Sequence, residues 1–219
     1  MTTVFTTLYD AHASRLEELK FCIARNAENP LVDRLAFLCE GNPEHLLTKF
    51  EVGNLKPVAV FETDRRASYR DFFNRANQAF PEDIVLVCNT DIYFDETLAL
   101  LPHIEPAKDF VVLTRYDRYS NGELEIMGGA NSINGASNDA WIFRPPLPDF
   151  AEGIQCGVIG CDTYLAQKAE EAGLRVRNPC LSVRAIHWHP SRTRNNQTPG
   201  GLCYWHAPGY RGKGVPPCR

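Results

Sequence analysis

The chain has 219 residues, of which 44% are hydrophobic and 23% are charged, with a formal net charge of −4. These proportions are ordinary for a globular protein, and they exclude a fibrous or disordered chain. No apolar run approaches the roughly 18 residues of a membrane span, and the first residues carry neither part of a secretory signal, so we expect a cytoplasmic protein of one domain.

Strands and helices are predicted to alternate along the chain. Short apolar runs predict strands over residues 3–8, 34–39, 57–61, 83–89, 110–114, 140–143 and 181–186. Helical spacing of apolar residues and end signals predict helices over residues 13–26, 68–80, 96–101 and 162–172. This order is typical of an α/β fold with a mainly parallel sheet flanked by helices.

We expect residues 1–194 to form the domain and residues 195–219 to form a Gly/Pro-rich basic tail. Residues 1–174 hold all 27 acidic residues and 15 basic ones, whereas residues 175–219 hold eight basic residues and no acidic one. This basic segment either neutralises the acidic body or closes over an anionic ligand. The side chains that could contact such an anion are Arg192, Arg194, Arg211 and Lys213.

The eight cysteines include no C-x-x-C pair, and three of them lie within apolar runs. This pattern favours reduced thiols in a cytosolic protein over a disulfide framework or a structural zinc site. A pairing of Cys203 with Cys218 in the tail stays open.

Polar side chains follow several predicted strands, at the edge of a parallel sheet where ligands bind. After the strand over residues 83–89 come Asn89 and Asp91, and after the last strand come His187 and His189. A carboxylate fixed directly after a buried strand can hold Mg²⁺ or Mn²⁺ together with substrate phosphates, although Asn-Thr-Asp is also a common turn. Alternation in an extended segment puts both histidines on one face, where either could complete the metal site.

Asp162 stands at the start of a predicted helix, where an acid either complements the helix dipole or serves as a general base. Asp139 precedes the strand over residues 140–143, and Trp141 lies within it. Small polar residues around 128–131 suggest a loop over the site.

The order of these elements resembles the GT-A-fold glycosyltransferases that use nucleotide sugars, especially the family-2-like bacterial enzymes, over residues 3–194. Asn89-Thr90-Asp91 occupies the place of the family's Asp-x-Asp motif. Gly160-Cys161-Asp162, followed by a helix and Gly173-Leu174-Arg175-Val176, resembles its Glu-Asp motif and the segment after it. Asn89 and Cys161 depart from the family pattern, because each replaces a carboxylate.

The resemblance implies transfer of a sugar from a nucleotide-diphosphate donor to an acceptor hydroxyl, with inversion and with Mn²⁺ or Mg²⁺. Asp91 and His187 or His189 would hold the metal, and Asp162 would be the base. Asp139 would bind sugar hydroxyls or serve as the base in place of Asp162, and Trp141 would either stack on a sugar face or be a core aromatic residue. Further donor contacts are expected from residues at the strand ends: Asp10 and Glu40 for the base or ribose, and Asn89 for a ribose hydroxyl. One of the arginines that follow two strands is expected at the diphosphate, with Arg65 and Arg115 as the first candidates and Arg66 and Arg118 as the others. The acceptor would be a saccharide, a lipid-linked molecule or another hydroxyl compound, and peripheral membrane contact is compatible with the sequence.

Three other classes compete with this interpretation. A nucleotidyltransferase also combines an α/β sheet, a metal and a nucleotide, but residues 8–13 lack the glycine-rich basic loop expected after its first strand. A non-catalytic nucleotide- or sugar-binding module would leave Asp162 without a role. Nucleic-acid binding by the basic tail is disfavoured, because the body is acidic and no nucleic-acid motif is present.

Overall fold

The computed structural model describes residues 1–52, 56–128, 135, 137–190 and 203–218. Most of the predicted loop at 128–131, as well as Arg192 and Arg194 of the tail, lies outside these residues. No helix in the described part of the chain combines the length and apolar character needed to cross a membrane.

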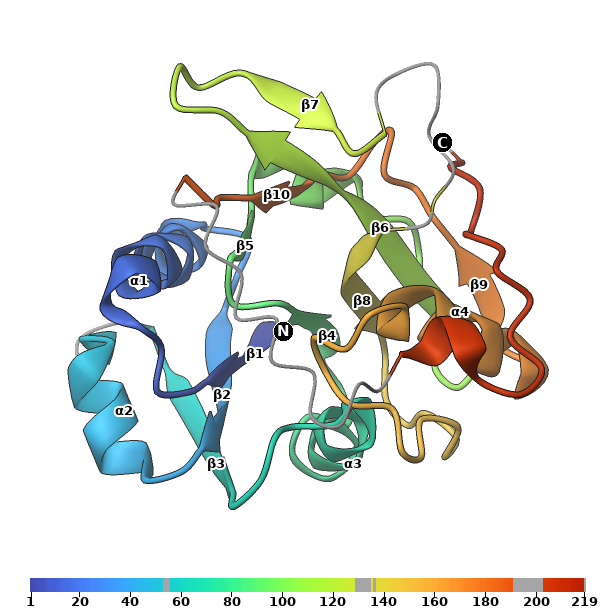
Figure 1. The fold of residues 1–219 in the computed structure, drawn as a ribbon, viewed down its shortest axis with the longest axis horizontal. Helices are drawn as coiled ribbons and strands as arrows, with labels where there is room; N and C mark the ends of the chain where they lie inside the picture. The colour runs from blue at the N-terminus through green and yellow to red at the C-terminus, as the bar shows by residue number, and fades with distance from the viewer. Residues whose placement is uncertain (53–55, 129–134, 136, 191–202, 219) are drawn as a thin grey trace.

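One sheet crosses the molecule (Figure 1), with strand order β3-β2-β1-β4-β8-β6-β10-β5 and with β7 and β9 pairing to β6. Its strands are β1 (Thr2–Leu8), β2 (Arg34–Glu40), β3 (Val58–Thr63), β4 (Ile84–Cys88), β5 (Ile92–Phe94), β6 (Asp109–Arg118), β7 (Leu124–Ile126), β8 (Asn138–Phe143), β9 (Arg175–Arg177) and β10 (Ala185–His187).

The sheet is mainly parallel, as the sequence predicts. β1 pairs in parallel with both β2 and β4, β2 with β3, and β6 with β9 and β10. β8 is an exception, because it runs antiparallel to both β4 and β6. The start of β8, at Asn138 and Asp139, therefore lies at the same edge as the carboxyl ends of β1, β4 and β6.

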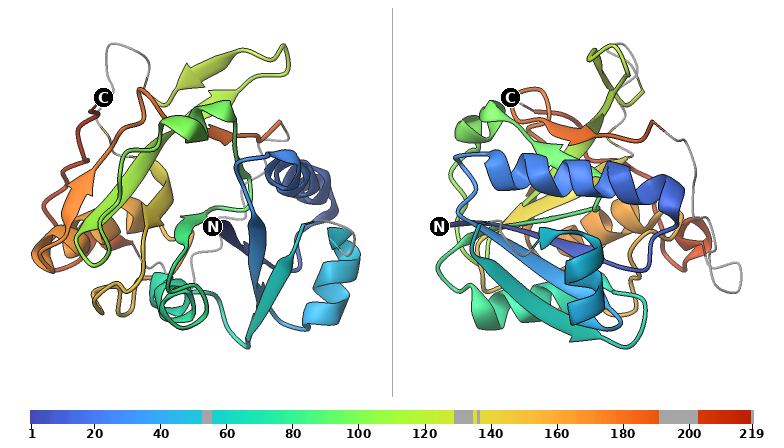
Figure 2. Two further views of the ribbon diagram at one scale, coloured as in Figure 1. Left: turned by 180° about the vertical axis from the view of Figure 1, so that it is seen from behind. Right: turned by 90° about the vertical axis from the view of Figure 1, so that its left-hand side faces the viewer.

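Helices cover both faces of the sheet, which explains why its central strands are apolar throughout. The helices are α1 (Ala13–Glu28), α2 (Pro43–Lys49), α3 (Tyr69–Ala79) and α4 (Cys161–Glu171), with the 3₁₀ turns η2 (Glu96–Leu100) and η4 (Tyr204–His206). Successive residues of a strand alternate between the two cores: Val4 and Leu86 pack on the side of α1, whereas Phe5 and Val85 pack on the side of α3 and α4. Figure 2 shows the helices on either side of the sheet.

Most predicted strands and helices are present, with ends that differ by a few residues. The predicted helix over residues 68–80 is α3, which Ser68 caps in a capping box with Asp71. The predicted strand over residues 181–186 is confined to Ala185–His187, and the predicted helix over residues 96–101 is a 3₁₀ turn. The prediction also missed α2, although Asn42 caps it and Pro43 begins it, a common start signal.

The described part of the tail, residues 203–218, packs against α4 and then runs toward β9 (Figure 1). The Tyr204 ring stacks on Tyr164 with centroids 5.2 Å apart, and its hydroxyl donates to the carbonyl oxygen of Gly153 at 2.6 Å. The Tyr210 hydroxyl lies 2.7 Å from Oγ1 of Thr163. These contacts place η4 beside the start of α4.

Candidate functional site

A cavity of about 960 Å³ opens at the carboxyl edge of the central strands. It lies where the strand order switches between β1 and β4, the position at which ligands bind in open α/β sheets. Its polar and ionisable lining includes Tyr9, Arg15, Glu40, Arg66, Asn89, Asp91, Arg115, Asn138, Asp139, Asp162, His187, His189 and Tyr210. Side chains from most of the central strands therefore meet in one place.

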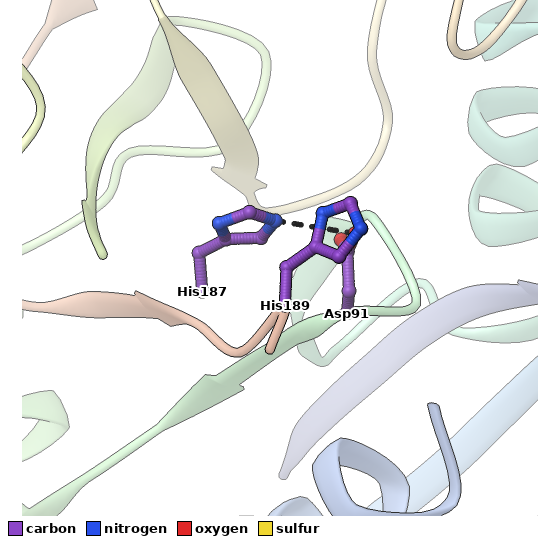
Figure 3. Close-up of side chains that lie close together, drawn as sticks. All are labelled: Asp91, His187 and His189. Carbon is purple, nitrogen blue, oxygen red and sulfur yellow. Dashed lines mark hydrogen bonds and ion pairs between the residues drawn. The ribbon is translucent and has the colours of Figure 1, made fainter. Parts of the chain in front are cut away.

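Asp91, His187 and His189 form a cluster in this cavity (Figure 3). They bring one carboxylate oxygen and two imidazole nitrogens within 4.8 Å of one another. Asp91 follows β4, and His187 ends β10, whose partner β5 begins directly after Asp91. A carboxylate and two imidazoles suit Mn²⁺, Zn²⁺ or another first-row metal, so this donor set fits a divalent cation.

A second layer of side chains orients the cluster. Nδ1 of His187 lies 2.7 Å from Oδ1 of Asp117, which leaves Nε2 facing Asp91 at 3.3 Å. Metal-binding histidines commonly make such a contact to a carboxylate through their other nitrogen. Although burial opposes its charge, the hydrogen bonds to Asp117 and Asp91 raise the pKa of His187 to about 9.

Arg15, at the start of α1, also reaches Asp91. Its guanidinium donates to Oδ2 of Asp91 and to Oε2 of Glu18, each at 2.7 Å. Burial alone would raise the pKa of Asp91, but His187 and Arg15 hold that pKa well below its usual range. Asp91 is therefore a permanent carboxylate, as a metal ligand must be.

Asn89 and Asp139 form a separate network beside the cluster. Nδ2 of Asn89 donates to Oδ1 of Asp139 at 2.7 Å. The other carboxylate oxygen of Asp139 accepts from the Ser137 hydroxyl at 3.1 Å and from Arg115 at 3.4 Å. The amide that stands in place of the first acid of an Asp-x-Asp motif is thus turned toward Asp139.

Asp162 has different surroundings at the first turn of α4. Its Oδ2 accepts a hydrogen bond from the backbone N–H of Asn138 at 3.1 Å, and no ion pair among the described residues includes it. Burial, together with the charge of Asp139, raises its pKa to about 6, despite the backbone N–H groups that favour the charged form. A carboxylate with a pKa near neutrality is suited to take and release a proton.

The remaining predicted side chains are divided between the cavity and other places. Glu40 lines the cavity and accepts from the backbone N–H of Ala67 at 2.8 Å. Trp141 borders the cavity too, but it is only 1% exposed and packs edge-on against Tyr69 in the core. Asp10 and Arg65 do not line the cavity, because Asp10 pairs with Lys49 and Arg65 pairs with Asp71 at 2.8 Å.

Sequence reasoning missed Arg15 and Asp117. A signal for Arg15 was present: it lies four and seven residues before Leu19 and Cys22 on the buried stripe of α1, a position that calls for a buried partner. Arg66, one of the arginines expected beside a diphosphate, lines the cavity, whereas its neighbour Arg65 does not. The strand alternation that carries Arg115 inward also carries Asp117 to the same face.

Comparison with solved structures supports the fold. A mannosyltransferase from Pyrobaculum calidifontis, solved with GDP-mannose and Mn²⁺, aligns over 87% of this chain with 14% identity and a TM-score of 0.57. A nucleotide-diphospho-sugar transferase from Desulfovibrio desulfuricans aligns over 90% of this chain and 89% of its own length, with 15% identity and a TM-score of 0.53. The chain has a Rossmann-like GT-A fold.

These proteins resemble the chain in structure but share little sequence with it. The chain spans 57% of the length of the Pyrobaculum enzyme. A 4-diphosphocytidyl-2C-methyl-D-erythritol synthase from Anaerococcus prevotii aligns with a TM-score of only 0.46, too low for any inference about this chain. Comparison of the sequence with family models found no match, and neither did comparison with curated proteins.

Proposed function

We propose that this protein is a metal-dependent glycosyltransferase that moves a sugar from a nucleotide diphosphate to an acceptor hydroxyl. One observation carries the proposal: a cavity at the carboxyl edge of a GT-A-fold sheet combines a three-ligand metal cluster with a buried carboxyl whose pKa is near 6. A metal held by the cluster would contact a diphosphate, and the carboxylate would take a proton from a hydroxyl.

The donor end of the proposal rests on Asp91, His187 and His189. A divalent cation held there would stabilise the charge that develops on the departing nucleoside diphosphate. Arg15, Arg66 and Arg115 line the same cavity, so they are the candidates for charge-assisted hydrogen bonds to phosphate oxygens. Of the two arginines predicted first for this role, Arg115 lines the cavity, whereas Arg65 is engaged by Asp71 outside it.

The acceptor end rests on Asp162. In its ionised form this carboxylate takes the proton of the acceptor hydroxyl as the oxygen attacks the anomeric carbon, and attack opposite the leaving group inverts that carbon. Asp139 is the weaker candidate for the base, because Asn89, Ser137 and Arg115 already engage both of its oxygens. We assign Asp139 to the positioning of Asn89 and Arg115.

Product analysis tests the proposal against the competing classes. The protein is incubated with Mn²⁺, a panel of nucleotide sugars and a mixture of saccharide acceptors, and released nucleotides are separated by chromatography. Glycosyl transfer releases a nucleoside diphosphate, which acceptor should increase and Asp162→Asn should abolish. The matched control is Asp149→Asn, an exposed carboxylate outside the cavity.

Two results would contradict the proposal. Formation of a nucleotide sugar from a nucleoside triphosphate and a sugar phosphate, with release of pyrophosphate, would identify a nucleotidyltransferase. Metal-dependent binding of a nucleotide sugar with no turnover for any acceptor, in wild type and in Asp162→Asn alike, would identify a binding module.

A further inference from the structure

The described tail presents one large aromatic side chain at the rim of the cavity. Trp205 lines the cavity, yet 60% of its surface is exposed. Its neighbour across the rim, Ile159, is 46% exposed and also lines the cavity. Exposed apolar side chains that gather at a cavity, unlike ones scattered singly, are typical of ligand-binding or interaction sites.

The protein holds this indole in a fixed place. Tyr204, the residue before it, is buried and donates its backbone N–H to the carbonyl oxygen of Ile159 at 2.9 Å. The indole lies so close to Gly160 that a Cβ there would come within 2.4 Å of its Cδ1 atom. Gly160 also has a φ of +79°, so a glycine is favoured there on two grounds.

The same glycine links the indole to the proposed base. Gly160 is the N-cap of α4, and Asp162 follows it in the first helical turn. A flat apolar surface and a carboxylate that accepts hydrogen bonds therefore stand at neighbouring positions of one cavity wall. This combination suits a pyranose ring, which carries apolar C–H groups on one face and hydroxyl groups at its edge.

We propose that Trp205 and Ile159 form the acceptor subsite and that the acceptor is a saccharide whose ring stacks on the Trp205 indole. This assignment rests on the proposed function, because it is the acceptor hydroxyl that must reach Asp162. The sequence left open a saccharide, a lipid-linked molecule or another hydroxyl compound as the acceptor. The subsite selects the saccharide.

A lipid surface is the competing occupant of an exposed tryptophan. Two features disfavour it: the indole borders a cavity lined by Asp139, Asp162 and other polar side chains, and it packs against that cavity's wall. An interfacial tryptophan would instead be expected on an outward apolar or basic surface.

The test follows the indole N–H signals of the protein by NMR. The chain has three tryptophans, and loss of one signal in Trp205→Phe assigns the signal of Trp205. The probes are methyl α- and β-pyranosides of glucose, galactose, mannose and N-acetylglucosamine, up to 100 mM, with a nucleoside diphosphate and with diamagnetic Mg²⁺, which leaves the signals near the site sharp. Sorbitol is the control ligand, because it carries hydroxyl groups without a ring face.

At least one pyranoside should shift the Trp205 signal in a saturable way, whereas sorbitol should not. Trp205→Ala should weaken that binding ten-fold or more, and Trp205→Phe should retain part of it. Leu100→Ala, which removes a comparably exposed apolar side chain outside the cavity, should bind as the wild type does. A thermal shift by nucleotide sugars with Mn²⁺ should be the same in Trp205→Ala and wild type.

The subsite is refuted if no pyranoside shifts the signal, if sorbitol shifts it equally, or if Trp205→Ala binds as tightly as wild type. A response of the signal to phosphatidylcholine–phosphatidylglycerol vesicles but not to pyranosides would also refute it, in favour of a lipid surface. The two failures are distinguishable: donor binding without a pyranoside response overturns only the subsite, whereas a pyranoside response without donor binding overturns the transferase and with it the acceptor role of the pyranose site.

Discussion

Asp91 and Asp162 line the same cavity, but their surroundings differ in one decisive respect. Asp91 is compensated by two cationic side chains, Arg15 and His187, and its pKa lies far below the usual range. Asp162 has backbone partners and the nearby negative charge of Asp139, and its pKa is raised to about 6. Environments that push the pKa values of two acids apart in this way separate their chemical roles.

Asp91 thus carries a fixed negative charge at one end of the cavity, whereas Asp162 at the other end can gain and lose a proton near neutral pH. A carboxylate that holds a metal must remain ionised throughout a reaction, whereas a base must gain a proton without a large cost in free energy. Substitutions that alter one carboxylate should therefore affect binding or turnover, but not both equally.

The largest expected effect is the loss of turnover in Asp162→Asn. Removal of a general base lowers rates by about 10²–10⁴-fold, and the amide still accepts the hydrogen bond from Asn138. Donor affinity, measured by calorimetry with Mn²⁺, should stay within two-fold of wild type, about the scatter of such a comparison. Equal turnover in the variant and wild type would remove Asp162 from the reaction.

Asp91→Asn should have the opposite profile. We expect its donor affinity in the presence of Mn²⁺ to fall about 100-fold, because a first-sphere carboxylate ligand is lost, and to become independent of the metal. Calorimetry with and without Mn²⁺ measures both effects, and Asp149→Asn serves as the matched control. A variant that still binds donor more tightly with Mn²⁺ than without it would contradict the metal assignment.

Asp162 should also reduce the stability of the fold when it is ionised. Its pKa is raised from 3.8 to about 6 in the folded protein, which corresponds to up to about 3 kcal/mol of destabilisation above pH 6. Asp162→Asn should therefore be more stable than wild type at pH 8, and the difference should vanish as the pH falls through 6 to 4. Urea unfolding at both pH values measures it, and a variant less stable at pH 8 would contradict the raised pKa.

Asp117→Asn should weaken the metal site by a smaller factor. The change removes the charge that orients His187 but keeps an oxygen acceptor, and losses at such outer positions are about 10-fold in metal affinity. Mn²⁺ titration by electron paramagnetic resonance measures that affinity. Glu125→Gln on exposed β7 is the control, and an equal loss in both variants would mean that the general charge of this region, rather than the His187 contact, is responsible.

The smallest expected effect is the change of kcat/KM with pH between pH 5 and 8. Because the base must be ionised, kcat/KM should be half of its plateau near pH 6 and should fall about ten-fold for each further unit of acidity. Steady-state rates between pH 5 and 8 test this expectation. A flat profile over that range would mean that a group other than Asp162 limits the proton transfer.

The sequence predicted the fold and the ends of the main strands because apolar runs and helix caps are local signals. Asp91 and His187 are each tied to a strand end, and Asp162 to a helix start, so their meeting at one edge follows from the topology. The contacts of Arg15 and Asp117 depend on which side chains face each other across separate elements, and no local pattern specifies that.

Long-range contacts also decide which predicted residues reach the cavity. Asp10 follows its strand by two residues, and the loop carries it outward to Lys49 rather than inward. Asp139 reaches the cavity because β8 runs antiparallel, which the apolar run over residues 140–143 could not indicate. Strand direction is a long-range property, set by the connections rather than by the residues of the strand.

Anomalous diffraction tests the central claim most directly. Crystals of the wild-type protein are soaked with Mn²⁺ and a nucleoside diphosphate, and data are collected at the manganese absorption edge. The account predicts an anomalous peak within bonding distance of the Asp91 carboxylate and of an imidazole nitrogen of His187 or His189, with diphosphate oxygens beside it. Bound diphosphate with the manganese elsewhere, or with none at Asp91, would contradict it.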